Sequence, residues 1–160
     1  MSVRIAVGGK LYVPKRIFDH AHASVRFYGS ALDPLTVKLA LRLPADRTHR
    51  DGEPRLGRTR KGKVMEYSPY RGGMWAMTSE RWVKSPRLSV HLEWLLSQLE
   101  PKAKAIAALR REGVNIDFFC FSSGSTPHPP SLPRTIRQRA TALGIRIDID
   151  HYVASTTERL

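Results

Sequence analysis

The sequence predicts a single α+β domain in which a mixed, mostly antiparallel sheet carries two or three helices packed on one face. Two observations lead to this prediction. Residues 88–112 contain leucines spaced for one stripe of an α-helix, and several short segments alternate apolar and polar residues, as strands with one buried face do. The chain has 160 residues, the length of one domain, and no internal repeat or linker divides it.

The segment 88–112 is the predicted central helix. Its leucines recur at i, i+4, i+7, i+8 and i+11, which places Leu88, Leu92, Leu95, Leu96 and Leu99 on one side of the helix. Pro101 has no backbone N–H, so we expect the helix to break near Glu100 and to restart with the proline in its first turn. Gly113 is the predicted end. Leu95 and Leu96, in the middle of the stripe, should be among the most buried residues.

Alternating apolar and polar residues predict the strands. The predicted strand segments are residues 3–7, 11–13, 23–29, 74–79, 114–121 and 145–153. Gly8 and Gly9 separate the first two runs, which is typical of a tight β-hairpin. In the last two segments Phe119, Phe121 and Tyr152 alternate away from the residues assigned to the core. Trp75, in the middle of its segment, is expected to pack in the core.

Two shorter helices complete the predicted elements. Asp33 can cap a helix over residues 34–43, with a proline at its first position. Ser131 can cap a second helix over residues 132–143, which Gly144 would end. We therefore expect residues 1–22 to be an N-terminal extension with a β-hairpin, residues 23–153 to form the domain, and residues 154–160 to be a frayed tail.

The charge of the chain points to anionic partners. Its 27 Lys and Arg residues exceed its 14 Asp and Glu residues, a formal net charge of +13. Five of the excess positive charges lie between Arg42 and Lys63, a segment with few apolar residues that predicts a mobile loop or an exposed ribbon. This segment is either an anion-contacting arm or a solvated loop. Its candidate binding residues are Arg47, Arg50, Arg55, Arg58, Arg60, Lys61 and Lys63.

The cysteine content and the N-terminus predict a soluble cytoplasmic protein with no membrane partner. Cys120 is the one cysteine of the chain, so no internal disulfide can form and a reducing compartment suffices. The N-terminus lacks the apolar run of a signal peptide, and no stretch is apolar for the roughly 20 residues that a membrane span needs.

Sequence motifs for catalysis are absent. The chain has no G-x-S-x-G elbow, no phosphate-binding Gly-Lys-Ser/Thr loop, no H-E-x-x-H and no C-x-x-C. Cys120 lies on the apolar face of its strand, where a thiol stays protonated and inert. His20 and His22 share one side of an extended chain, but no third ligand is close in sequence, so we interpret them as surface histidines. We therefore predict no catalytic residue, no cofactor and no metal site.

Three aspartates are the strongest candidates for chemistry. Asp148 and Asp150 share a strand face, and Asp117 joins them if the two strands are neighbours. Together they could hold Mg²⁺ or act as an acid and a base in a metal-dependent enzyme. The alternative that we favour is a solvated sheet face, with Arg146 among the carboxylates.

Five longer segments of the sequence resemble those of a known family. They are VRFYGSALDP, the basic stretch that leads to GGMWAMTS, HLEWLLSQLEPK, VNIDFFC and LGIRIDIDHY. On these segments the chain from about Ala23 to Val153 resembles the bacterial domain of unknown function 4279 family. The resemblance implies a compact α+β domain, and it brings no established reaction and no catalytic residues.

Binding is therefore the predicted function. The first hypothesis is a non-enzymatic protein-binding module whose aromatic sheet face (Phe119, Phe121, Tyr152) meets an unknown partner or a second copy of the chain. An immunity-like role follows by analogy of size alone. The second hypothesis is a nucleic-acid-binding protein in which Arg42 to Lys63 contacts phosphates while Tyr28 or Phe119 stacks on bases. The three aspartates of the same face oppose the second hypothesis, because they repel phosphate.

Overall fold

The computed structural model describes residues 5–7, 10–12 and 20–153. Strands β1 (Ile5–Val7) and β2 (Lys10–Tyr12) pair antiparallel, with Ile5 opposite Tyr12. The predicted turn at Gly8 and Gly9 lies outside the described residues. The predicted C-terminal tail, residues 154–160, lies outside the described residues.

The centre of the fold is a five-stranded sheet with the order β4-β7-β3-β8-β9. Its strands are β3 (His20–Gly29), β4 (Arg47–His49), β7 (Gly73–Thr78), β8 (Asn115–Gly124) and β9 (Arg146–Val153). Strands β8 and β9 run parallel, and the other three neighbouring pairs are antiparallel. The predicted mixed, mostly antiparallel sheet is therefore confirmed.

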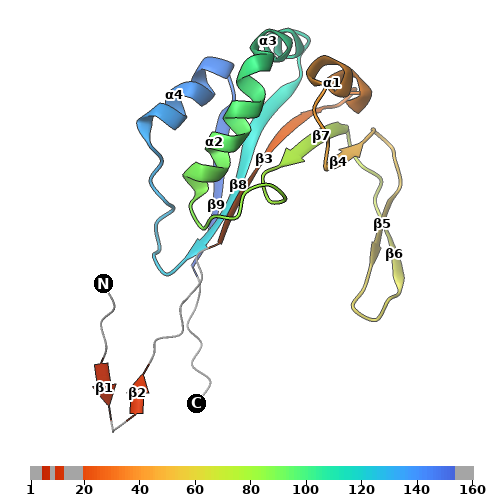
Figure 1. Cartoon of the computed structure of the whole chain (residues 1–160). Helices are drawn as coiled ribbons and strands as arrows, with labels where there is room; N and C mark the ends of the chain where they lie inside the picture. The colour runs from red at the N-terminus through yellow and green to blue at the C-terminus, as the bar shows by residue number, and fades with distance from the viewer. Residues whose placement is uncertain (1–4, 8–9, 13–19, 154–160) are drawn as a thin grey trace.

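Helices cover one face of this sheet (Figure 1). They are α1 (Pro34–Leu41), α2 (Leu88–Leu99), α3 (Ala103–Arg111) and α4 (Arg134–Leu143), and the 3-10 turn η1 (Glu100–Lys102) joins α2 to α3. Because α2, η1 and α3 follow one another as one bent helix, the described residues form three helical units: α1, the bent helix and α4. The bend occurs at Pro101, which lacks the N–H that a straight helix needs, as the sequence predicts.

The core lies between the helices and the sheet. The predicted leucine stripe faces it, and Leu95 and Leu96 are both 0% exposed. Trp75 packs there edge-on against Phe27, with ring centroids 5.5 Å apart, so its predicted place in the core is also confirmed. On every long strand the side chains alternate between this core and the opposite face.

The predicted ends of the shorter helices are partly wrong. Helix α1 begins as expected, because the Asp33 carboxylate accepts the Leu35 N–H at 3.0 Å, but it ends at Leu41, where Arg42 turns into the left-handed conformation. This end is two residues earlier than predicted.

Helix α4 begins at Arg134, two residues later than predicted, and Ser131 does not cap it. Leu132 precedes Pro133, and the proline ring disfavours a helical conformation for the residue before it. Gly144, in the left-handed conformation, ends the helix as predicted.

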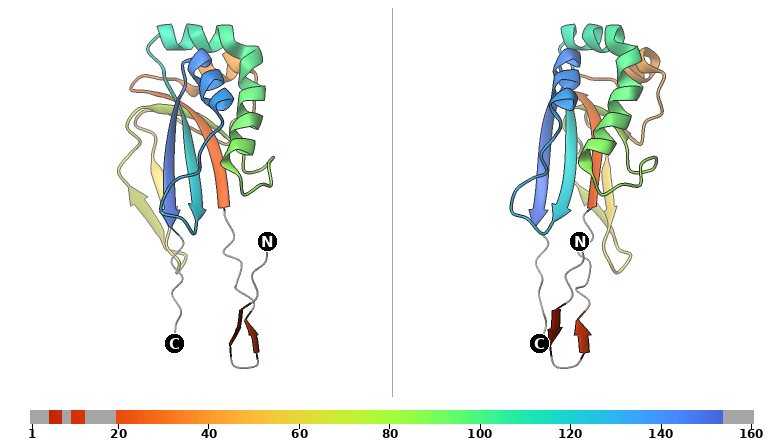
Figure 2. Two further views of the ribbon diagram at one scale, coloured as in Figure 1. Left: turned by 90° about the vertical axis from the view of Figure 1, so that its left-hand side faces the viewer. Right: turned by 60° about the vertical axis from the view of Figure 1, so that its left-hand side comes forward.

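The second half of the basic segment belongs to an exposed ribbon. Strands β5 (Arg55–Arg58) and β6 (Val64–Tyr67) pair antiparallel, and we call residues 55–67 the basic ribbon. In the left view of Figure 2 the basic ribbon projects on the side of the sheet opposite the helices. The sequence did not predict β4, which adds to the edge of the sheet before the ribbon begins.

Candidate functional site

No helix of the described residues packs on the other face of the sheet, and we call this face the open face. Its side chains come from all five strands, because alternate residues of a strand point to the same side. They are Arg47 and His49 of β4; Met74, Ala76 and Thr78 of β7; His20, His22, Ser24, Arg26 and Tyr28 of β3; Asn115, Asp117, Phe119, Phe121 and Ser123 of β8; and Arg146, Asp148, Asp150 and Tyr152 of β9.

The open face is hollowed along β3 and β7. A hollow of about 650 Å³ lies at the Tyr28 end, where His49 and Arg71 line it. A second hollow of about 310 Å³ reaches toward the His22 end. Arg26 and Met74 line both hollows, so the two form one groove along the face.

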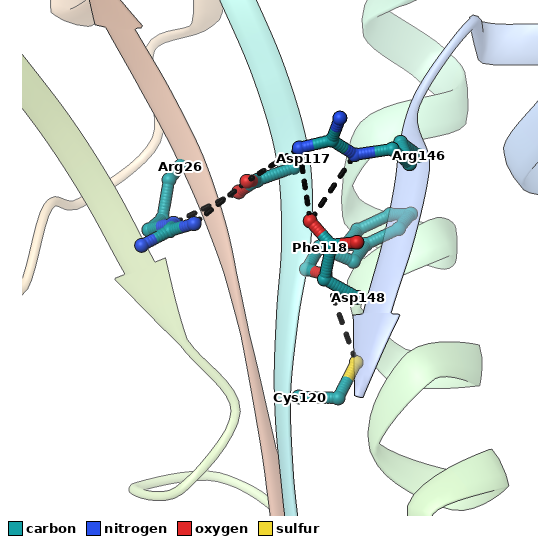
Figure 3. Close-up of polar contacts among 6 residues, drawn as sticks. All are labelled: Arg26, Asp117, Phe118, Cys120, Arg146 and Asp148. Atoms are coloured by element: carbon teal, nitrogen blue, oxygen red, sulfur yellow. Dashed lines mark hydrogen bonds and ion pairs between the residues drawn. The ribbon is translucent and has the colours of Figure 1, made fainter. Parts of the chain in front are cut away.

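Arg26, which lines the groove, forms an ion pair with the buried Asp117. Arg26 Nε and Nη2 donate to the two carboxylate oxygens of Asp117 at 2.8 and 2.7 Å, and Asp117 is only 1% exposed (Figure 3). The hydrogen bonds to Asp117 raise the pKa of Arg26 above its usual value. Arg26 also lies over the Phe119 ring, 4.5 Å from its centroid.

The three candidate carboxylates do not gather at one point. Strands β8 and β9 are neighbours, as the enzyme hypothesis requires, but their parallel register sets Arg146 opposite Asp117. Arg146 Nη2 lies 3.0 Å from Asp148 and 3.9 Å from Asp117, between the two carboxylates (Figure 3). Asp150 instead accepts the Tyr152 hydroxyl at 3.1 Å. This arrangement matches the favoured alternative, a sheet face with arginine among its carboxylates.

Two of the three predicted aromatic residues, Phe121 and Tyr152, form a stack with His22 at the far end of the open face. Phe121 stacks on His22 with centroids 5.1 Å apart and on Tyr152 with centroids 5.4 Å apart. Tyr152 remains 54% exposed and Phe119 37% exposed. No described residue covers this end, although aromatic side chains of this size usually pack against something.

The predicted basic residues divide among three places. Arg55, Arg58, Arg60, Lys61 and Lys63 all belong to the basic ribbon and are exposed. Arg47 is on β4 and lines the second hollow of the open face. Arg50 turns away and pairs with Asp33 at 3.1 Å, beside α1, so the structure does not bring it to the open face.

A row of rings connects the basic ribbon to the sheet. His49 on β4 stacks on Tyr70, with centroids 3.8 Å apart. The Arg55 guanidinium lies 5.8 Å from the Tyr70 ring and 5.3 Å from the Tyr67 ring. The base of the ribbon is thereby held beside the groove.

Cys120 points into the core, as its place on the apolar strand face predicts. The residue is buried, and burial together with the nearby aspartates Asp117 and Asp148 raises the pKa of its thiol to about 12. Its Sγ lies 3.9 Å from the Phe118 carbonyl oxygen, on the core side of β8 (Figure 3).

Sequence reasoning missed Glu80. His20 is exposed as expected, but His22 is partly buried, and one ligand atom from each of His20, His22 and Glu80 lies within 4.8 Å of the others. Burial lowers the pKa of His22, and Glu80 opposes that shift. The spacing of the two histidines was the available signal. Glu80 is distant in sequence, and only the pairing of β3 with β7 brings it near.

Comparison with known proteins gives a family and no activity. Among the described residues, no helix has both the length and the apolar character that crossing a membrane requires. No curated protein and no solved structure matches the chain. A family model described as "Domain of unknown function (DUF4279)" matches residues 19–154, which cover all five strands of the sheet and all four α-helices. The chain therefore belongs to the DUF4279 family.

Proposed function

We propose that this protein is a non-enzymatic binding module that takes an acidic segment of another protein on its open face. The observation that carries the proposal is an aromatic stack that no described residue covers, at one end of a groove beside the basic ribbon. An interaction surface of this kind combines apolar anchors with a charged rim.

The apolar part of the surface supports a protein partner. The Phe121 and Tyr152 rings stack on each other, and Phe119 is exposed on the same face beside Arg26. Large exposed aromatic residues are frequent anchors in protein interfaces. Burying their exposed area against a partner would stabilise a complex by about 25 cal/mol per Å² of apolar surface, before the costs of association.

The charge of the surface supports an acidic partner. The basic ribbon carries Arg55, Arg58, Arg60, Lys61 and Lys63 against Glu66 alone. Its potential attracts a segment rich in Asp and Glu and accelerates the encounter. A second copy of a chain with a net charge of +13 would be repelled, which argues against a homodimer through this face.

Nucleic acid fits the same surface less well. Asp148 and Asp150 lie on the open face beside the aromatic rings that would have to stack on bases. A phosphate backbone along this face would meet both carboxylates, whereas a polypeptide can offer them a hydrogen-bond donor or a cation. Catalysis has little support, because Cys120 is buried and protonated and Asp117 is held by Arg26.

A phage-displayed library of random peptides, selected on the purified protein, tests the proposal. We expect enriched peptides that combine Asp or Glu with apolar residues. Phe119→Asp should weaken a selected peptide about 30-fold, the effect of losing a contact worth about 2 kcal/mol. The matched control is Leu39→Asp, at an exposed leucine of α1 on the helix side.

The role of charge needs its own pair of variants. Replacing Arg55, Arg58, Arg60 and Lys61 with Ser should weaken the same peptide and flatten its salt dependence. Replacing the exposed Lys104, Arg111, Arg134 and Arg137 of α3 and α4 with Ser removes the same net charge from the helix side and should leave binding unchanged.

Two results would overturn the proposal. The first is no enriched peptide, or peptides whose affinity ignores both the Phe119 and the ribbon substitutions. The second is that the protein binds a labelled poly(dT) strand or a DNA duplex and no peptide. In that case the ribbon substitutions would flatten the slope of log affinity against log salt by several units, because each phosphate contact on duplex DNA contributes about 0.9 to the slope. That second outcome would assign the ribbon to nucleic acid.

A further inference from the structure

We infer that His20, His22 and Glu80 form a binding site for a divalent transition-metal ion, with Zn²⁺ as the best match. The site stands on three side chains at one end of the open face and does not depend on the proposed protein partner. The inference goes against the expectation from sequence, which found no third ligand for the two histidines.

The sheet register explains why the third ligand is present. Strand β3 pairs with β7 up to Ser24 opposite Thr78. Continuing this antiparallel register by two residues on each strand brings His22 opposite Glu80. His20 lies two residues before His22, at the start of β3, and on the same side of the strand. The backbone bond from Ser79 N–H to the Ala23 carbonyl, 2.8 Å, holds the two segments together at this point.

The distances suit a metal ion after a small adjustment. The three ligand atoms lie within 4.8 Å of one another. Ligand atoms around a tetrahedral Zn²⁺ with bonds of 2.0–2.2 Å are about 3.4 Å apart. His20 and Glu80 are exposed, so rotation of their side chains can close the difference. The His22 ring is held in place by its stack on Phe121.

A buried nitrogen without a partner independently points to a ligand. The His22 Nδ1 atom is buried, and no hydrogen-bond partner for it exists among the described residues. Leaving a buried polar atom unpaired is costly, so such atoms nearly always have a partner, a water or an ion. A cation bound through Nδ1, rather than through Nε2, of His22 would supply the partner.

The ligand set selects the class of metal. Two imidazole nitrogens and one carboxylate oxygen suit Zn²⁺, whereas Mg²⁺ prefers oxygen ligands only. Three protein ligands leave a fourth position of a tetrahedral ion open to water or to a donor atom from another molecule. The open position distinguishes this site from a closed structural zinc site with four protein ligands.

Calorimetric titration of the tag-free, full-length protein with ZnCl₂ tests the inference. We expect one Zn²⁺ per chain, a rise of the melting temperature with Zn²⁺ concentration, and no binding of MgCl₂ under the same conditions. Bound Co²⁺ should show the visible absorption of a tetrahedral or five-coordinate site. Glu80→Gln and His20→Gln should each weaken Zn²⁺ binding by at least about 100-fold. Losing a group that only hydrogen-bonds to a ligand costs up to about 100-fold, and losing a ligand itself should cost at least as much.

Matched controls separate this site from unspecific binding. His49→Gln removes a histidine elsewhere on the groove, and Glu66→Gln removes an exposed carboxylate of the basic ribbon, so both should bind Zn²⁺ like the unmodified protein. The variants His20→Gln and Glu80→Gln change exposed residues, and circular dichroism verifies that both are folded. No Zn²⁺ binding by the unmodified protein, or binding that survives both substitutions, would overturn the inference.

Discussion

Ser79 Oγ lies 2.7 Å from Nδ1 of His91, and this buried pair ties the end of β7 to the first turns of α2. The Ala23 N–H donates to the same Ser79 oxygen at 3.0 Å. His91 Nε2 lies 2.7 Å from the Ser85 carbonyl, which can only accept, so Nε2 carries a hydrogen. In the neutral imidazole Nδ1 then accepts from the Ser79 hydroxyl, and every polar atom of this chain of bonds has a partner.

This network predicts a coupled effect of two substitutions. His91→Leu should cost about 1–3 kcal/mol, because the Ser79 hydroxyl would lose its acceptor inside the core. Adding Ser79→Ala should cost less than the sum of the two single changes. Urea denaturation of the four proteins of the double-mutant cycle measures this, and strictly additive costs would mean that the two side chains do not interact.

The Arg26–Asp117 pair predicts a strong dependence on the arginine. Arg26→Ala should cost about 3–5 kcal/mol at neutral pH, since it leaves the buried Asp117 carboxylate without its bidentate partner. The matched control is Arg146→Ala, where the side chain is 68% exposed and the expected cost is below about 1 kcal/mol. Equal urea midpoints for the two variants would show that Arg26 does not compensate a buried charge.

The leucine stripe of α2 should be the centre of stability. Leu95→Ala should lower the free energy of unfolding by about 2–5 kcal/mol, from the lost burial and the cavity that remains. The same substitution at the exposed Leu39 of α1 should change it by less than about 0.5 kcal/mol. Similar denaturation midpoints for both variants would contradict the position of the core.

The Cys120 thiol predicts a difference in reactivity between the folded and the unfolded chain. Its folded pKa of about 12 exceeds its unfolded value, so at pH 8 the folded protein contains almost no thiolate at this site. Iodoacetamide should therefore label the native protein far more slowly than the protein in guanidinium chloride, as mass spectrometry can follow. The labelling rate in the native state should increase as the pH rises toward 12. Labelling of the native protein at the rate of a free cysteine would mean that Cys120 is accessible.

Local sequence patterns determined the helices, the long strands and the faces of those strands. The leucine spacing of residues 88–99 and the missing N–H of Pro101 were sufficient to predict the bent central helix. Period-two alternation likewise assigned Phe119 and Phe121 to the side away from the core. These predictions succeeded because helix and strand periodicity place a side chain using only its near neighbours in the chain.

Tertiary structure decided which side chains meet. Arg26 reaches Asp117 because β3 pairs with β8, and Arg146 comes opposite Asp117 because β9 joins β8 in parallel. Glu80 approaches His22 by continuation of the β3–β7 register, across 58 positions of sequence. Strand order and register depend on the packing of the whole core and on the connections between strands. A pattern within one segment contains no information about either, so the ion pair, the groove and the proposed metal site could be seen only in the folded chain.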